Sequence, residues 1–428
     1  MALKAGGSPY RSNVKNDIKT RLGTFVDGGT CTGAVLLKEL LQNADDAGAK
    51  YLLIVLDERA APTDAPEAFA SLLGPALLVA NDGPFNEDQF DAITKVASGQ
   101  KLADNAATGR FGVGFTSVFL VGDVCLLCSQ GSLIVFDLLR QIIPTWAKLE
   151  GSEAGKDDEI WTTNRQTGHK GHSRWMNSQQ NDILRHVLGS ELFADHAMRA
   201  AVSGMPEGLK APFGEKVSVF RIPFRTRATN HAETLYSGYF DEPETRSTLF
   251  DEMKEEARHC MVFLRSVERI TLVKYSHGRV QDAFECKVSP WGKEAKAYFD
   301  VLRAGKGQHE SQFQKRTVAI SGEESREYLV SMKVDFDNEE FADMREDNSS
   351  WKKCVPCGAV AICANHSTTD AERWRVLLPL TREGPSAALI NGGFFLDQAR
   401  HAPTFRAGST GGETAWNKAI IRTFIVPL

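Results

Sequence analysis

The chain of 428 residues has few of the features that mark membrane, secreted or nucleic-acid-binding proteins. It has no run of eighteen or more apolar residues, which argues against a transmembrane helix. The first residues also lack the apolar stretch of a secretory signal. With 50 basic and 55 acidic residues the net charge is −5, so there is no excess of positive charge for nucleic acid. We therefore expect a cytoplasmic protein with no membrane partner and no clear nucleic-acid partner.

Cysteine is also scarce, with eight residues in the whole chain. In a long chain that is not exported, we expect free thiols rather than a disulfide framework. The spacing of Cys354, Cys357, Cys363 and His366 is similar to that of a zinc site. However, residues 358–362 between them are apolar and predict a buried strand, which leaves little room for a metal loop. We expect thiols in or beside a strand rather than zinc.

The length of the chain predicts two or three domains. Apolar residues recur at helical spacing over 34–47, and Gly48 provides a stop signal. Residues 150–210 are interpreted as an insertion of uncertain structure. Other helices are expected at 14–24, 85–97 and 247–264, and strands at 51–56, 76–80, 124–128, 132–137, 217–222, 268–274, 327–335, 355–363 and 374–380.

The helix predicted at 34–47 carries polar residues at a spacing that places them on one face. Glu39, Asn43 and Asp46 follow the pattern i, i+4, i+7. An Asn oxygen can bind Mg²⁺, and a Glu can accept a proton from an attacking water. Taken alone, the pattern is better explained as a solvated helix face. A site is favoured only if other motifs join this one.

The second motif, Asn81-Asp82-Gly83, follows the strand predicted at 76–80. A short carboxylate there can accept a hydrogen bond from the exocyclic amine of adenine, and glycine lets the backbone approach the base. Taken alone, the same three residues are an ordinary turn.

The third motif is a glycine-rich segment, with Gly109, Gly112 and Gly114 just before a predicted helical segment. Such glycines leave main-chain N–H groups free to face phosphate oxygens. Residues 98–110 are polar and small, as in a mobile loop. A glycine-rich loop is weak evidence by itself. No strand directly precedes this one, unlike in a Rossmann fold, and no Gly-Lys-Ser/Thr follows, unlike in a P-loop.

The order of the three motifs resembles the Bergerat-type ATPases, which include gyrase, the ninety-kilodalton heat-shock chaperones, histidine kinases and MutL. Within this group the sequence is most similar to sacsin. The similarity is carried by LLKELLQNADDAGA (36–49), LVANDGPFNEDQF (78–90) and GRFGVGFTSVFLVGDV (109–124). It spans most of the chain but not residues 150–210 and 276–350.

The resemblance implies a role for each motif residue. Glu39 would be the general base and Asn43 the Mg²⁺ ligand, with Asp46 and Ala47 near the nucleotide. In the chaperones an Asp stands where this chain has Asn81, so either Asn81 or Asp82 could read adenine. The resemblance adds Gly83, Lys101, Gly109, Arg110, Phe111, Gly112, Val113, Gly114, Phe115 and Ser218 to the nucleotide site, the last retaining the hydroxyl of the family's Thr. Arg382 and Arg400 are candidates for a catalytic arginine from a second domain, although arginine is usually a surface residue.

The resemblance also implies an α+β fold and a function. Residues 1–235 would form a Bergerat-type ATP-binding sandwich, a mixed sheet with helices on one face, and residues 236–428 a second, middle-like α+β domain. ATP and Mg²⁺ would be the cofactors. Slow hydrolysis would drive lid closure and association of domains or subunits, in a sacsin-like chaperone or an ATP switch. A second copy or a protein client is the expected partner, and a longer protein that continues past this chain is one interpretation.

Three alternatives remain open. A nucleotide-binding module without hydrolysis would have no need of Glu39. A histidine kinase would usually carry a second amide at position 39 and a helix with a phosphoacceptor His. A DNA-dependent ATPase would be expected to carry a basic stripe, which the sequence lacks.

Overall fold

The chain folds into two compact units, which are described separately below. Unit 1 consists of residues 1–255 and 270–284, and unit 2 of residues 256–269 and 285–428. The predicted division between residues 235 and 236 stays a prediction. The computed structural model describes residues 19, 22–23, 33–61, 63, 72–85, 89, 93, 114–130, 132–137, 139, 160–164, 185–206, 209, 216–227, 234–346, 351, 354–365, 373–376, 378–383, 388–395, 403–404 and 412–428.

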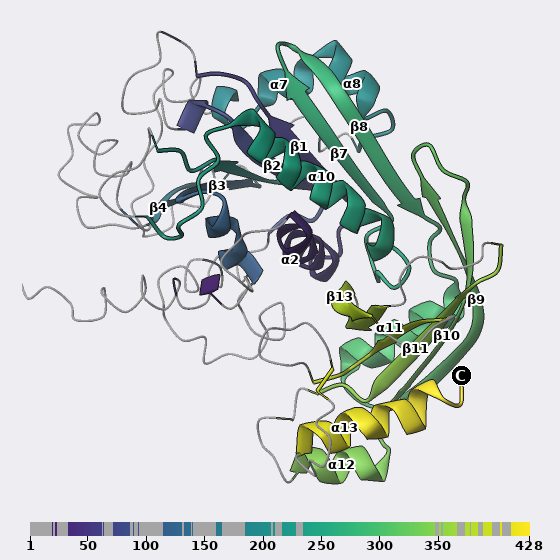
Figure 1. Ribbon diagram of the computed structural model, residues 1–428. Coiled ribbons are helices and arrows are strands. Elements are labelled where there is room, and N and C mark those ends of the chain that lie inside the picture. The colour runs from purple at the N-terminus through teal and green to yellow at the C-terminus, as the bar shows by residue number, and fades with distance from the viewer. Residues whose placement is uncertain are drawn as a thin grey trace, which may run out of the picture. The chain divides into compact units, whose positions relative to one another are not determined.

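Unit 1 is built on a twisted sheet (Figure 1). Its central strands are apolar and buried along their whole length. All the strand pairs described between β1 and β5 are antiparallel. The spatial order is β7 (Arg269–Ser276), β1 (Tyr51–Asp57), β2 (Ala76–Asn81), β6 (Ser218–Pro223), β3 (Val124–Ser129), β4 (Ser132–Asp137) and β5 (Ile160–Asn164). Residues up to Phe284 of β8 (Arg279–Val288) also belong to this unit.

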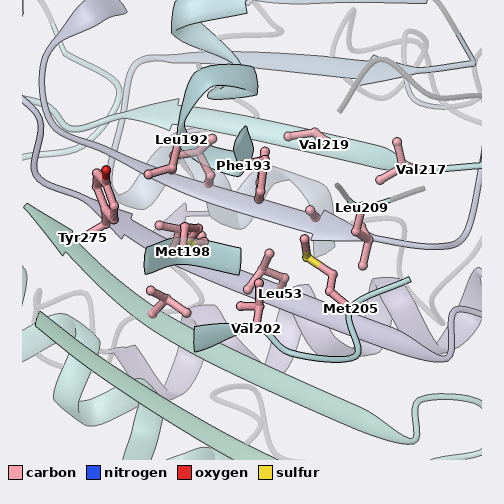
Figure 2. Packing of buried hydrophobic residues seen from close by; sticks show 14 of the residues in the cluster. Leu53, Leu192, Phe193, Met198, Val202, Met205, Leu209, Val217, Val219 and Tyr275 are labelled. Atoms are coloured by element: carbon pink, nitrogen blue, oxygen red, sulfur yellow. The ribbon is translucent and has the colours of Figure 1, made fainter. Parts of the chain in front are cut away.

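Two short helices, α7 (Ser190–Ala194) and α8 (His196–Ala201), cover one face of this sheet. Asp195 separates them and caps α8, because its carboxylate accepts hydrogen bonds from the N–H groups of Ala197 at 2.8 Å and Met198 at 3.0 Å. Figure 2 shows Leu192, Phe193 and Met198 packed on the strands. The full cluster holds Tyr51, Leu53, Val55, Leu78, Ala80, Leu192, Phe193, Met198, Val202, Met205, Leu209, Val217, Val219, Val273 and Tyr275. Part of the insertion of uncertain structure is therefore a layer of the core.

The opposite face of the sheet carries α2 (Gly33–Asp46) and the 3₁₀ helix η2 (Gly114–Leu120), which pack against each other. Side chains alternate along a strand, so Leu52, Ile54 and Leu56 point to this face, and all three are fully buried. The helix predicted at 34–47 is confirmed within one residue. Gly48 ends it in the left-handed conformation, with φ 74°. The N–H of Ala49 donates to the carbonyl of Ala44 at 3.0 Å, a bond found in many helix C-caps that end on glycine.

Unit 2 also combines hydrogen-bonded strands with helices, so both units confirm the predicted α+β class. The strand order is β13 (Leu378–Glu383), β12 (Arg373–Val376), β14 (Leu389–Gly392), β11 (Cys357–Cys363), β10 (Arg326–Asp335) and β9 (Gln308–Ile320). The pair β12–β14 is parallel and the other described pairs are antiparallel. The helices are α11 (Lys293–Ala304), α12 (Glu339–Glu346), α13 (Gly412–Ile420) and the π-helical turn η4 (Ile421–Ile425). Phe341, Trp416 and Phe424 form the centre of an aromatic core between α12, α13 and η4.

Two of the cysteines with zinc-like spacing lie in a strand, as expected. Cys357 and Cys363 are the first and last residues of β11. A strand of this length separates its ends by about 20 Å, so the two thiols cannot bind one metal ion. His366 lies outside the described residues. Within the described ranges no three His, Cys, Asp or Glu side chains gather as a metal-binding group, and no helix there is long and apolar enough to span a bilayer. None of the described cysteines forms a disulfide bond, and all but Cys363 are buried.

Candidate functional site

The polar face of α2 is half-buried in the folded unit. Glu39, Asn43 and Asp46 share this face, and each is neither fully exposed nor fully buried. The opposite, apolar side of the helix packs into the unit through Leu36, Leu37, Leu40, Leu41 and Ala44. The three polar residues are therefore held in fixed positions by a well-packed helix, as a site would require.

The turn after β2 is held in shape by its own side chains. The Oδ1 of Asn81 accepts a hydrogen bond from the N–H of Gly83 at 2.9 Å. The Oδ1 of Asp82 accepts bonds from the N–H groups of Lys50 at 2.8 Å and Tyr51 at 2.9 Å. The carboxylate of Asp82 thus binds the start of β1, whereas Asn81 is buried on the α2 face of the sheet, opposite the α7–α8 cluster.

Gly83 brings the first and second motifs into contact. A Cβ atom at this position would lie 3.2 Å from the Cβ of Ala47 and 3.1 Å from the Oδ1 of Asn81. Such distances are tighter than most Cβ contacts, so the end of α2 approaches this turn closely because residue 83 has no side chain.

Ser218 joins the same turn to the neighbouring strands. It pairs with Asn81 on β2 and with Ser129 on β3. Its hydroxyl donates to the carbonyl of Gly83 at 2.7 Å and lies 2.9 Å from the hydroxyl of Ser129. Ser129 in turn accepts a bond from the N–H of Phe85 at 3.1 Å. The resemblance had pointed to Ser218 alone. Ser129 was missed, although its place directly after the apolar run 124–128 parallels that of Asn81 after 76–80.

The start of η2 is fixed on the same face by aromatic rings. Phe115 lies 4.7 Å from Phe136, 5.9 Å from Phe119 and 6.2 Å from Phe220, measured between ring centroids. Phe85, after the second motif, lies 6.1 Å from Phe220. Gly114 is the first residue of η2, so the end of the third motif is anchored beside the turn that Asn81 and Gly83 form.

The far end of η2 is held by a buried arginine. Arg225 donates to both oxygens of Asp123, at 2.8 and 2.9 Å, and to the carbonyls of Phe119 at 2.7 Å and Leu120 at 3.0 Å. The guanidinium is fully buried and its charge is compensated by the carboxylate. Both ends of η2 are therefore fixed against the sheet.

A second buried ion cluster lies at the C-terminal end of β1, whereas Asp82 binds the start of this strand. Arg221 donates to Asp57 at 2.8 Å, and Arg59 contacts both oxygens of the same carboxylate at 2.8 Å. Burial by itself would raise the pKa of Asp57, but hydrogen bonds and charge from Arg59 and Arg221 outweigh it and lower this pKa. Asp57 continues the row of Tyr51, Leu53 and Val55 on the α7–α8 face, so this cluster is separate from the motif residues.

For several residues implied by the resemblance, the proposed roles stay predictions. Arg382 lies in β13 of unit 2, and nothing is described of its side chain. The positions outside the described residues are Lys101, Gly109, Arg110, Phe111, Gly112, Val113 and Arg400.

The described features define an α+β protein in which one sheet face is closed by helices and the other holds buried polar residues beneath a long helix. The family model described as the Sacsin domain matches residues 15–286. That match covers more than half of the chain, so the chain belongs to the sacsin domain family. The predicted relationship to sacsin is confirmed.

Two individual comparisons give the scale of the similarity. The chain is 24% identical to sacsin from Homo sapiens over 416 residues, which are 92% of this chain and 8% of that protein. It therefore spans a small part of its curated relative. The crystal structure of the B-subunit of DNA gyrase from Myxococcus xanthus aligns with a TM-score of 0.32 at 8% identity, covering 75% of this chain and 67% of that chain.

Proposed function

We propose that this chain is a Bergerat-type ATP-binding module that binds a magnesium nucleotide on the α2 face of unit 1 and hydrolyses ATP slowly. One observation carries the proposal. The turn at Gly83 touches Ala47 at the end of α2 and accepts a hydrogen bond from Ser218 of β6. Segments far apart in the sequence, which the resemblance assigns to one nucleotide site, therefore meet at one place. Membership in the sacsin domain family supports the same assignment.

We assign base recognition to Asn81 rather than Asp82. The carboxylate of Asp82 already accepts two main-chain N–H groups at the start of β1. Asn81 lies on the α2 face. Its Oδ1 accepts one main-chain N–H and keeps a second lone pair, and its amide nitrogen is a donor, which together suit the edge of an adenine base. Ser218 supports it indirectly by holding the carbonyl of Gly83. A Cβ atom at position 83 would lie 3.1 Å from the Oδ1 of Asn81, so glycine here avoids crowding the amide that would read the base.

The polar face of α2 fits the metal and the reacting water. Asn43 offers a side-chain oxygen, the type of ligand that Mg²⁺ prefers, and bound Mg²⁺ would neutralise charge on the phosphates. Glu39 lies one helical turn before it and would accept the proton of the attacking water. Asp46 and Ala47 would border the nucleotide near Gly83. The glycine-rich segment 109–114 and Lys101 are proposed to face the phosphates.

Calorimetry with ADP and Mg²⁺ tests the site. Native protein should bind in a Mg²⁺-dependent manner, and Asn43→Ala should lose that dependence because the oxygen ligand is gone. Gln42→Ala is a matched control, since Gln42 is half-buried on the same helix but outside the i, i+4, i+7 pattern. Equal Mg²⁺-dependent affinity in native protein and Asn43→Ala would refute the assignment.

The same proposal includes a mechanical output. ATP binding would close the lid that the resemblance implies over residues 98–110 and change the association of domains or of two copies, as in a chaperone or an ATP switch. Arg382 and Arg400 remain the candidates for an arginine that completes hydrolysis. Light scattering after gel filtration, with a non-hydrolysable ATP analogue or with ADP, would measure any change in association. Identical masses and elution volumes would exclude nucleotide-driven self-association.

A further inference from the structure

The first turn of α2 is held by α10 (Pro243–Cys260), whose residues up to 255 belong to unit 1. The N–H of Gly33, the first residue of α2, donates to the Oε2 of Glu252 at 2.6 Å. The N–H groups in the first turn of a helix have no partner within the helix, and a negative charge there also interacts favourably with the helix dipole. Glu252 therefore supplies an anchor for the start of α2 from a residue 219 positions away.

No side chain separates the two helices at this point. A Cβ atom at Gly33 would overlap the carbonyl oxygen of Leu249 and would lie 2.8 Å from the backbone nitrogen of Met253. The close approach is possible because residue 33 is glycine. The relative placement of α2 and this part of α10 is thus set by direct contact of the main chain of α2.

The first turns of α10 are fixed in turn to the strands of unit 1. Arg246 is buried, and it donates two hydrogen bonds to the carboxylate of Glu58, the residue that follows β1. The bond from Nε is 2.9 Å long and the bond from Nη2 is 2.7 Å long. Its Nη1 also donates to the carbonyl of Phe240 at 2.6 Å. Lys274 of β7 donates to the hydroxyl of Ser247. Because α10 is bonded both to these strands and to Gly33, it fixes the start of α2 relative to the sheet.

We infer that Glu252 is a positioning residue for ATP hydrolysis: it fixes the start of α2 and thereby the position of Glu39, the proposed general base. This inference rests on the proposed function. With a rise of 1.5 Å per residue, Glu39 lies about 9 Å and Asn43 about 15 Å along α2 from Gly33. The far end of α2 is held independently, by the cap at Gly48 and by the contact of Ala47 with Gly83. Loss of the Glu252 anchor therefore displaces Glu39 more than Asn43, and slows hydrolysis more than it weakens binding.

Steady-state ATP turnover and ADP–Mg²⁺ calorimetry on the full chain separate the two effects. In Glu252→Ala, kcat should fall about 10- to 100-fold, the scale of a small misplacement of a reacting group, while the Kd for ADP changes by less than about threefold. In Glu252→Gln the loss should be smaller, because the carboxamide oxygen can still accept from Gly33. Asp251→Asn is the matched control, an exposed carboxylate on the adjacent residue, and should behave like the native chain.

Hydrogen exchange of the amides at 33–37 without nucleotide measures the anchor itself, and it should be faster in Glu252→Ala than in Asp251→Asn. Native-like kcat in Glu252→Ala, in a chain that does turn over ATP, overturns the inference and leaves the proposed function intact. Equal losses of kcat and of ADP affinity also overturn it, since they indicate general disruption of α2. A native chain that neither binds ADP nor hydrolyses ATP refutes the proposed function before any variant is compared.

Discussion

The two faces of the unit 1 sheet are built on different principles. The α7–α8 face is filled with apolar side chains from strands and helices (Figure 2). The charges of Asp57 and its arginine partners meet at the end of β1. The α2 face is also apolar in its centre, but Asn81, Ser218 and Ser129 are buried side by side on neighbouring strands. Burying polar groups costs free energy unless they are bonded. These three residues are bonded and hold one turn in shape, which is the reason we propose a site on this face.

Glu39→Ala should give the largest effect on ATP turnover, with almost no effect on stability. Removal of a general base reduces turnover by about 10²- to 10⁴-fold, whereas a half-buried surface substitution changes the free energy of unfolding by no more than about 0.5 kcal/mol. ADP release and chemical denaturation measure the two quantities. Equal background rates in the native chain and the variant would instead favour the module that binds nucleotide without hydrolysing it.

Asp57→Asn should give the largest loss of stability, on the α7–α8 face. Two arginines lose their buried counter-charge, which costs about 3–5 kcal/mol. The pKa of Asp57 is lowered in the folded chain, so its contribution is present above the unfolded pKa of about 4 and is lost as pH falls below it. The variant should therefore lose less stability on acidification than the native chain. Asp251→Asn, which changes an exposed carboxylate on α10 outside this cluster, is the control that should change neither quantity.

Leu53→Ala tests the hydrocarbon of the same face. The side chain is fully buried in the α7–α8 cluster, and truncation should cost about 2–5 kcal/mol in the free energy of unfolding. ADP affinity of the folded fraction should be unchanged, because the side chain points away from the α2 face. A weaker affinity at temperatures where the variant is fully folded would show that the two faces are not independent.

Ser218→Ala should lose less stability than Asp57→Asn or Leu53→Ala and yet affect function. Losing the hydrogen bond to the carbonyl of Gly83 costs about 1 kcal/mol, but the turn loosens and ADP affinity should fall several-fold. Val219→Ala, the next residue on the opposite face, should show the reverse pattern, a larger loss of stability with native affinity. If both variants bind ADP equally well, the hydroxyl network has no role in the site.

The sequence predicts unit 1 better than unit 2, because continuous apolar runs are easily recognised. The strands β1 to β4 are predicted within about one residue at each end. By contrast, β9 of unit 2 is missed, since only four of its 13 residues are apolar. The inward positions of β9 include Ser311 and Arg316, and the guanidinium of Arg316 is buried against the ring of Trp291 at 3.9 Å. That stabilisation depends on tertiary partners that no local pattern reveals. The strand predicted at 374–380 is in fact two paired strands, β12 and β13.

For the candidate site, sequence motifs identify residues but not their partners. The spacing of Glu39 and Asn43 correctly predicts one helix face, yet only the structure shows that Asp82 is engaged by the start of β1. Ser129 and Glu252 enter through contacts across strands or between distant helices. Such residues carry no local signature, because their role is defined by neighbours that folding brings together.

Two buried thiols on β3 provide a native reporter for each face of the sheet. Cys125 pairs with Phe136 on the aromatic side, and Cys128 pairs with Val219 on the α7–α8 side. Burial raises the pKa of both thiols, that of Cys128 to about 12, so neither forms a reactive thiolate in the closed state. Each thiol can then be alkylated only after the layer that covers its own face of the sheet has opened. Mass spectrometry of the labelling kinetics would give the opening rate of each face of the sheet separately, without any engineered probe.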